Sequence, residues 1–439
     1  MSKKKKLLIK TGILVIWLLI WQLITVMVHN DILLTGPVDV IKRLGKEIFE
    51  TSFYRAVSGT IVRVLLGFLL GLMIGVLLGA VSYRYEMVKM FFAPVVSVMK
   101  SVPVAAIVVL ILIWMGSDNL AVPISFVVVF PQIYISTITG LNEVTKEQKE
   151  MMHSFEMRFF NRCMYIYRPA LMPYLINAVR ISVGMGFKSG IAAEVIGIPV
   201  HSIGEALYMS KIYLDTSGVL AWTVVVLLIS TIMEKLIVFL VKKAGNVYVR
   251  PMTGVRKQEE KDFSFEALDV TYDNGVQIKV PKVAARAGER LCIMGPSGCG
   301  KTTWLLATGK ISGVKPAYVF QDNRLCMQCS AKDNVLMVCS SKKVSEVKEL
   351  LTTLLPEEAI DKPVAEFSGG MRRKTVLARA LLSGGNLLLL DEPFTGMDEE
   401  SKRKAAECIL KYAEGRTLIF ATHNEEDMHI LQSKNAGIF

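Results

Sequence analysis

The stretch RLCIMGPSGCGKTTWLL, Arg290–Leu306, decides the fold of the carboxyl-terminal half of this 439-residue chain. An apolar run that suits a buried strand leads into the pattern G-x-x-x-x-G-K-T, and a run that suits a helix follows it. The glycines of such a loop let backbone N–H groups turn toward phosphate oxygens, and the amino terminus of the helix adds a favourable dipole. We therefore predict a nucleotide-binding loop formed by Gly295, Ser297, Gly298, Cys299, Gly300, Lys301, Thr302 and Thr303.

Two side chains of this loop have separate predicted roles, and an acidic pair elsewhere complements them. Lys301 would reach the β- and γ-phosphates of the nucleotide, and the hydroxyl of Thr302 would bind Mg²⁺. A second buried strand, NLLLLDEPF, ends in Asp391 and Glu392. Asp391 is placed to hold Mg²⁺, and Glu392 is placed to polarise the water that attacks the γ-phosphate. Such a pair can also form a helix-capping turn, but its occurrence beside a phosphate-binding loop favours catalysis.

Three further segments place polar groups where strands end or helices begin. EFSGGMRRKTVLARALL opens a basic helix, which predicts a second anion site at its amino terminus. Gln321 follows one predicted strand in YVFQDNRL, and His423 follows another in LIFATHNEED. Asp398 ends the segment FTGMD. The residues of the second anion site are Ser368, Gly369 and Gly370.

This set of segments, in this order, resembles the ATP-binding cassette of ABC transporters, from about Phe263 to the end of the chain. The resemblance implies that Gln321 contacts Mg²⁺, the attacking water and the membrane domain, and that His423 is the switch histidine at the γ-phosphate. It also implies a D-loop role for Asp398 and stacking of Tyr272 on adenine, with a core tyrosine as the alternative. In the family, the Ser368–Gly370 signature closes over ATP held by a second cassette, so one cassette alone cannot form a complete site.

The amino-terminal half is far more apolar. The chain as a whole is 52% hydrophobic, with a mean hydropathy of +0.43, which is too apolar for an ordinary soluble protein. We predict six membrane spans, counting an amino-terminal run that lacks a signal-peptide cleavage site. The spans lie at about 11–28, 57–81, 90–115, 121–141, 174–196 and 219–241.

The basic charge of the chain lies beside these apolar runs. The net charge is +12, and residues 1–255 carry 25 Lys and Arg against 14 Asp and Glu. This distribution fits lipid headgroups and argues against nucleic-acid binding, which needs the basic excess on a soluble face. The segments on the amino-terminal side of the membrane carry 14 Lys and Arg, whereas those on the other side carry five. Positive residues favour the cytoplasmic side, so we predict a cytoplasmic amino terminus and a cytoplasmic cassette.

Several residues inside the spans are unusual for a membrane. Four glycines, Gly67 to Gly79, recur at every fourth position of the second span, which favours close helix packing and leaves a pore-lining role open. Lys100 and Pro103 interrupt the third span. Lys188 and Glu194 lie in the fifth span, where ionisable groups are costly and usually face a bundle interior or a watery path. We predict a translocation-path role for one of them, with snorkelling or pairing of Lys188 as the alternative.

A polar segment at about 142–170 separates the fourth and fifth spans. The six spans resemble permeases of binding-protein-dependent importers, most of all the nitrate, sulfonate and taurine branch. The resemblance implies that this segment couples the spans to the cassette, with Glu150 opening it and Pro169 closing it. The segment departs from the family at Glu156, where glycine is usual, and at Met151 and Met152, where alanine is usual.

The sequence therefore predicts a six-helix transmembrane domain of the type I importer kind, residues 1–245, fused through a linker at 246–262 to an α/β P-loop cassette at 263–439. We expect an ATPase that uses ATP and Mg²⁺ and works as a dimer, with a second copy or a related chain, beside an extracytoplasmic solute-binding protein. The resemblance implies a small anion such as a sulfonate or nitrate, or a small heterocycle, as solute. An ABC exporter and a membrane-anchored ATP-dependent regulator remain as alternatives. Cys326 and Cys329 form a C-x-x-C without a second pair, which favours reduced cytosolic thiols over a metal site.

Overall fold

The computed structural model describes residues 3–28, 30, 32–245, 263–265, 268–271, 277–280, 283–296, 298–309, 316–339 and 344–438. The predicted linker at 246–262 lies outside the described residues, as do Tyr272 and Ser297. The chain divides into two compact units. The membrane unit comprises Met1–Asn142 and Leu171–Asn246, and the cassette unit comprises Glu143–Ala170 and Val247–Phe439.

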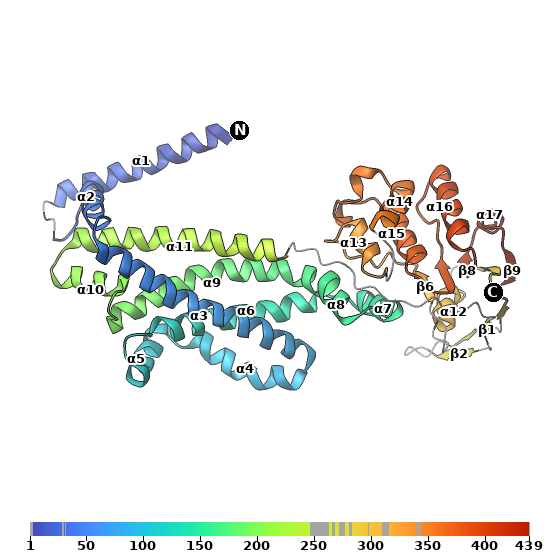
Figure 1. Ribbon diagram of the computed structural model, residues 1–439, viewed down its shortest axis with the longest axis horizontal. Coiled ribbons are helices and arrows are strands. Elements are labelled where there is room, and N and C mark those ends of the chain that lie inside the picture. Colours follow the sequence, from blue (N-terminus) through green and yellow to red (C-terminus); the bar gives the residue numbers. More distant parts are fainter. Residues whose placement is uncertain are drawn as a thin grey trace. The chain divides into compact units, whose positions relative to one another are not determined.

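The regular elements of the membrane unit are all helices in its described part; α3, α6, α9 and α11 run side by side, whereas α1 extends away from them (Figure 1). Five helical stretches are long and apolar enough to cross a membrane: Thr11–Val28, Thr51–Arg84, Ala121–Asn142, Phe159–Gly197 and Thr216–Gly245. The helices of this unit are α1 (Lys3–Val28), α2 (Pro37–Glu47), α3 (Thr51–Arg84), α4 (Glu86–Ser101), α5 (Val104–Met115), α6 (Ala121–Asn142), α9 (Arg168–Gly197), α10 (Ile203–Ile212) and α11 (Thr216–Gly245).

The predicted third span is not one straight helix. Helices α4 and α5 meet at a break where the chain bends by 104°. Pro103 stands directly before α5, and the ring of a proline prevents the residue before it from continuing a helix. Among the described residues the number of spans is therefore five, or six if this bent pair counts as one span.

Helices α3 and α6 are packed unusually closely because four glycines of α3 face α6. All four glycines are buried, and a Cβ atom at Gly67 would lie 2.2 Å from the carbonyl oxygen of Val122. At Gly75 and Gly79 the added Cβ would lie 2.9 Å and 2.8 Å from side-chain atoms of α6. The helix-packing role of these glycines is therefore confirmed.

The core of the cassette unit is a parallel sheet of five strands in the order β6-β7-β8-β5-β9. All paired strands in this sheet are parallel, and β7 and β8 are buried along their whole length. Because parallel strands end at the same edge of a sheet, the residues that follow β5, β6, β7 and β8 are brought together there. The five strands are β5 (Arg290–Met294), β6 (Pro316–Val319), β7 (Leu387–Asp391), β8 (Thr417–Thr422) and β9 (Lys434–Ile438).

Helices and two small antiparallel pairs complete the cassette unit. Strand β1 (Phe263–Phe265) pairs with β4 (Val283–Ala285), and β2 (Leu268–Thr271) pairs with β3 (Gln277–Val280). The helices are α12 (Lys301–Thr308), α13 (Ala331–Leu336), α14 (Val344–Leu354), α15 (Gly369–Leu382), α16 (Glu399–Tyr412) and α17 (Glu425–Ile430).

The coupling segment, residues 143–170, folds as part of the cassette unit. It contains α7 (Lys146–Ser154), α8 (Phe159–Arg162) and a π-helical turn at Cys163–Tyr167. Helix α7 begins with a capping box, in which the Thr145 hydroxyl accepts from the Gln148 N–H and the Gln148 side chain accepts from the Thr145 N–H. Buried side chains of the segment share a hydrophobic core with the sheet; they are Val144, Met151, Met152, Met157, Tyr165 and Ile166.

Candidate functional site

The phosphate-binding loop has the backbone that its glycines permit. Gly298 and Gly300 have φ values of 85° and 105°, which residues with a side chain rarely adopt. A Cβ at Gly298 would meet no atom within 4 Å, so space is available above the loop for a phosphate group. The Lys301 ammonium donates to the carbonyl oxygens of Gly295 at 2.5 Å and Pro296 at 2.9 Å. Lys301 thus folds back over its own loop, and binding of a phosphate would compete for its three donors.

Two of the three predicted magnesium ligands, Thr302 and Asp391, lie in contact. The Thr302 hydroxyl donates to Asp391 Oδ2 across 2.5 Å, which joins the first turn of α12 to the end of β7. Asp391 is only 4% exposed, and burial raises the pKa of its carboxyl, although Thr302 and Arg373 oppose that change. Carboxylate and hydroxyl oxygens are hard donors that suit Mg²⁺. The pair therefore fits a small divalent cation, whose charge would also compensate the buried carboxylate.

Glu392 and His423 form a second pair at the same edge of the sheet. Glu392 Oε1 lies 2.9 Å from His423 Nδ1, and the side chains are 22% and 67% exposed. Glu392 has a φ of 48°, a conformation that costs energy for a residue with a side chain and that is often found at functional sites. The backbone N–H of Glu392 donates to Ala421 O at 2.9 Å, so pairing with β8 holds this strained residue in place.

A buried arginine, Arg373, holds the chain segments that follow β6 and β7 at this edge of the sheet; no motif in the sequence indicated this role. Arg373 on α15 is 2% exposed, and its guanidinium donates to four backbone carbonyls. Through Phe320 and Gln321 it holds the chain that follows β6, and through Asp391 and Glu392 it holds the chain that follows β7. Burial lowers the pKa of Arg373 to about 10. Gln321 itself is exposed, and its position depends on this contact of its backbone.

The prediction for Arg373 follows from its four acceptors. We expect Arg373→Leu to lower the free energy of unfolding of the cassette by about 3 kcal/mol, because it leaves buried carbonyls without a donor. We also expect ATP hydrolysis to fall, since Glu392 would no longer be held in its strained conformation. Thermal unfolding and phosphate release would measure both effects. Arg403→Leu, at an exposed position on α16, is the matched control, and equal behaviour of the two variants would contradict this role.

The signature residues and the D-loop aspartate have local capping roles in this chain. Ser368 caps α15 by accepting from the Met371 N–H, and Asp398 caps α16 by accepting from the Ser401 N–H. The hydrogen bond from Ser401 lowers the pKa of Asp398. A Cβ at Gly370 would lie 2.6 Å from Gly396 O, so this position requires glycine, whereas Gly369 has open space around it.

The coupling segment contacts the cassette through charged and sulfur groups as well as apolar ones. Glu150 forms an ion pair of 3.0 Å with Arg324, whose guanidinium lies 4.0 Å above the Phe320 ring. Arg379 is fully buried, and its guanidinium contacts the sulfur of Met151 at 2.8 Å. Met151, one of the departures from the family pattern, is therefore in direct contact with the cassette. The coupling role of Glu150 stays a prediction, and Pro169 lies at the start of α9.

Glu156 occupies a backbone position that favours glycine. Its φ is 45°, just after α7 ends at Ser154. The chain therefore keeps the turn that glycine would make, at the cost of placing a side chain in the left-handed region.

We expect Glu156→Gly to stabilise the cassette unit by about 1 kcal/mol, because glycine adopts a positive φ without a steric penalty. The melting temperature of the purified protein would measure the gain. Glu147→Gly, in the first turn of α7, is the matched substitution, and we expect it to lower the melting temperature because glycine weakens a helix. A lower melting temperature for Glu156→Gly would contradict the argument.

The two ionisable residues predicted for the translocation path have different surroundings. Glu194 is fully buried; it accepts from Thr60 Oγ1 at 2.6 Å and from Arg63 at 2.9 Å. These bonds join α9 to α3. Glu194 therefore has a structural role in holding the two helices together. Lys188 is exposed on α9.

Cys326 and Cys329 lie close together beneath the coupling segment. Both are buried, and Cys329 Sγ contacts the carbonyl oxygen of Tyr165 at 3.5 Å. No group of three or more His, Cys, Asp or Glu side chains suited to a metal ion occurs in the described part of the chain.

Comparison with known proteins agrees with this architecture. The family model of the binding-protein-dependent transport system inner membrane component matches residues 67–246, and the ABC transporter family model matches residues 308–395. The chain therefore belongs to the ABC transporters. It joins a permease of the binding-protein-dependent type to an ATP-binding cassette, and the match of the permease favours an importer over an exporter.

The chain is similar to several curated ATP-binding proteins of import systems. The taurine import ATP-binding protein of Roseobacter denitrificans is 33% identical over 171 residues, which cover 33% of this chain and 64% of that protein. The aliphatic sulfonates import ATP-binding protein of Bacillus licheniformis is 30% identical over 171 residues, which cover 34% and 67%. A spermidine/putrescine import ATP-binding protein of Oleidesulfovibrio alaskensis is 29% identical over 206 residues, which cover 40% and 55%. The chain thus spans between about half and two thirds of the length of these relatives.

Proposed function

We propose that this chain is a fused permease–ATPase that imports a small solute across the bacterial cytoplasmic membrane. Two copies, or one copy and a related chain, would supply two sets of spans and two composite ATP sites, and an extracytoplasmic binding protein would deliver the solute. The observation that carries the proposal is the contact of the coupling segment with the cassette core. Through Glu150 and Met151, the segment touches the arginines that pack behind the ATP site.

The chemistry follows from the residues at the carboxyl edge of the sheet. The loop N–H groups and Lys301 would bind the phosphates, and Thr302 and Asp391 would hold Mg²⁺, which would neutralise phosphate charge. Glu392 would accept a proton from the attacking water, and His423, 2.9 Å away, would orient that carboxylate or contact the γ-phosphate. Gln321 would close the site from the strand beside it. Ser368 and Gly370 would act on ATP held by the other cassette.

The remaining assignments are also proposals. We place the domain borders at 245 and 263, the amino terminus and cassette in the cytoplasm, and Lys188 on the translocation path. The names of the relatives include anionic sulfonates, the zwitterion taurine, and the cations spermidine and putrescine. The resemblance of the permease to the nitrate, sulfonate and taurine branch supports a small anion such as a sulfonate or nitrate, or a small heterocycle.

The test is ATP hydrolysis by the full chain in lipid nanodiscs, with and without solute-loaded candidate binding proteins. We expect basal hydrolysis, several-fold stimulation by one loaded binding protein, and uptake of its labelled solute into proteoliposomes. Hydrolysis that no binding protein stimulates, without uptake, would favour an exporter or a regulator. Absence of hydrolysis would mean that the chain pairs with a different ATPase subunit.

A further inference from the structure

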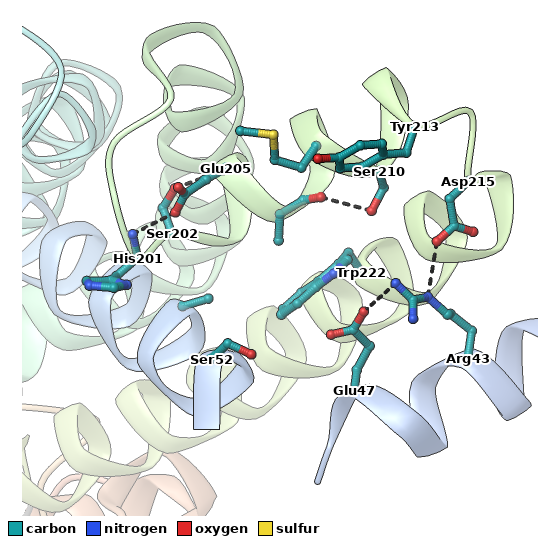
Figure 2. A pocket seen from close by; sticks show the side chains of 13 residues that line it. Arg43, Glu47, Ser52, His201, Ser202, Glu205, Ser210, Tyr213, Asp215 and Trp222 are labelled. Carbon is teal, nitrogen blue, oxygen red and sulfur yellow. Dashed lines mark hydrogen bonds and ion pairs between the residues drawn. The ribbon is translucent and has the colours of Figure 1, made fainter. Parts of the chain in front are cut away.

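The membrane unit contains an open pocket that the proposed transport cycle does not use. It lies among α2, α10 and the first turns of α3 and α11 (Figure 2), in the segments that the charge distribution assigns to the outer side of the membrane. Its volume is about 290 Å³, enough for a small organic group. The side chains that carry its chemistry are Arg43, Glu47, His201, Glu205, Asp215 and Trp222.

Acidic groups outnumber basic ones in this pocket. Arg43 is shared by two carboxylates, with 2.9 Å to Glu47 and 3.1 Å to Asp215. One guanidinium therefore compensates two negative charges. Burial raises the pKa of Glu47, although Arg43 opposes that change. Hydrogen bonds from Ser217 and Gly218, together with Arg43, outweigh burial and lower the pKa of Asp215.

A third carboxylate, that of Glu205, lines the same pocket. Glu205 Oε2 accepts from the backbone N–H of His201 at 2.7 Å, and no ion pair joins Glu205 to a basic side chain among the described residues. Apart from His201, the ionisable side chains of the lining are three carboxylates and one guanidinium. An anion would be repelled here, whereas a cation would replace a missing countercharge.

Aromatic side chains in the pocket lining also favour the binding of a cation. Trp222 is buried between Glu205 and the Arg43–Glu47 pair (Figure 2), and its ring stacks on Phe53 with 5.1 Å between ring centroids. Tyr213 lines the same space and is 78% exposed. Aromatic faces attract ammonium and guanidinium groups through their quadrupoles, most strongly for Trp.

We propose that this pocket binds a protonated amine or guanidinium group, held between Glu205 and Glu47 and against Trp222. The group would belong either to a free organic cation or to a basic side chain of the binding protein that docks on this side. The proposal is independent of ATP hydrolysis, because every group that it invokes lies in the membrane unit.

The test is binding of butylammonium to the full chain in phosphatidylcholine nanodiscs, measured by saturation-transfer difference NMR, with butyrate as the matched anion. We expect butylammonium to bind and butyrate not to bind. Glu205→Gln keeps the hydrogen-bond acceptor for His201 and should weaken binding about tenfold, since it removes a charge-assisted contact. Asp39→Asn is the control. It removes a charge from α2, the helix that carries Arg43 and Glu47, at a position outside the pocket, and should leave butylammonium binding unchanged.

A steric variant and a competition complete the experiment. Ser52→Phe, at an exposed position on the pocket rim, should block butylammonium in a protein whose melting temperature shows that it is folded. Equal binding of butylammonium and butyrate, or full binding by folded Glu205→Gln or Ser52→Phe, overturns the proposal. If excess butylammonium reduces stimulation by a binding protein, that protein supplies the cationic group. If butylammonium binds without such competition, the pocket serves a free cation.

Discussion

Replacing Glu392 by glutamine is expected to lower ATP hydrolysis by at least about a hundredfold, while ATP binding stays close to that of the wild type. Glutamine keeps the shape of the side chain and an oxygen that can face His423, but it cannot accept a proton from water. In the described part of the chain, the hydrogen bonds of this side chain go to His423 and Thr395. This variant should therefore bind ATP but hydrolyse it very slowly.

Phosphate release and nucleotide binding, both measured in nanodiscs, would check this expectation. Glu400→Gln is the matched control, because Glu400 lies on α16 and its side chain is 81% exposed in an ion pair with Lys404. We expect this control to hydrolyse ATP as the wild type does. Hydrolysis by Glu392→Gln within threefold of the wild type would assign proton transfer to another group, and loss of binding would mean a damaged fold.

Replacing Gly67 by valine should prevent the membrane unit from folding. The added Cβ would lie 2.2 Å from the carbonyl oxygen of Val122 and 2.8 Å from the Ser125 Cβ. A backbone oxygen cannot rotate away as a flexible side chain can, so α3 and α6 would have to separate along their length. Overpacking of even flexible cores costs about 1–3 kcal/mol, and separation of two helices costs more.

The measurement is the yield of monodisperse protein after extraction in mild detergent, followed by its melting temperature. Gly12→Val is the control, because a Cβ at Gly12, in α1, would meet no atom within 4 Å. We expect the control to behave as the wild type. Normal yield and melting temperature for Gly67→Val would show that α3 and α6 do not pack at this distance in the membrane.

Among the predicted site residues, Thr302 and Asp391 lie in contact as their motifs indicate, while nucleotide binding by the loop stays a prediction. The spacing of Lys301, Thr302 and the acidic pair predicts the positions of these side chains, because a strand–loop–helix unit fixes where each of them must point. The glycine spacing of α3 likewise predicted a packing face. Glu156 was noted as a departure, but its left-handed backbone depends on how α7 ends against the cassette.

Features that depend on distant segments could not be predicted in this way. Arg373 looked like one of several basic residues in a surface helix, and only the fold brings four carbonyls to its guanidinium. The third span was predicted to be interrupted at Lys100 and Pro103, but a sequence does not fix a bend of 104°. The pocket around Trp222 joins residues separated by more than 150 positions, so no local pattern indicates it.

The shared hydrophobic core of the coupling segment and the cassette has a consequence for biosynthesis. Residues 143–170 leave the ribosome before any strand of the cassette exists, and more than 200 further residues must follow before β8 is made. At about 5–20 residues per second, Met151 and Met152 wait for their partners for on the order of ten seconds or more. During that interval the apolar side chains of this otherwise polar segment lack their packing partners, and a chaperone or the bilayer interface must shelter them. Codon changes that slow translation after residue 170 should therefore lower the yield of folded transporter more than the same changes placed earlier.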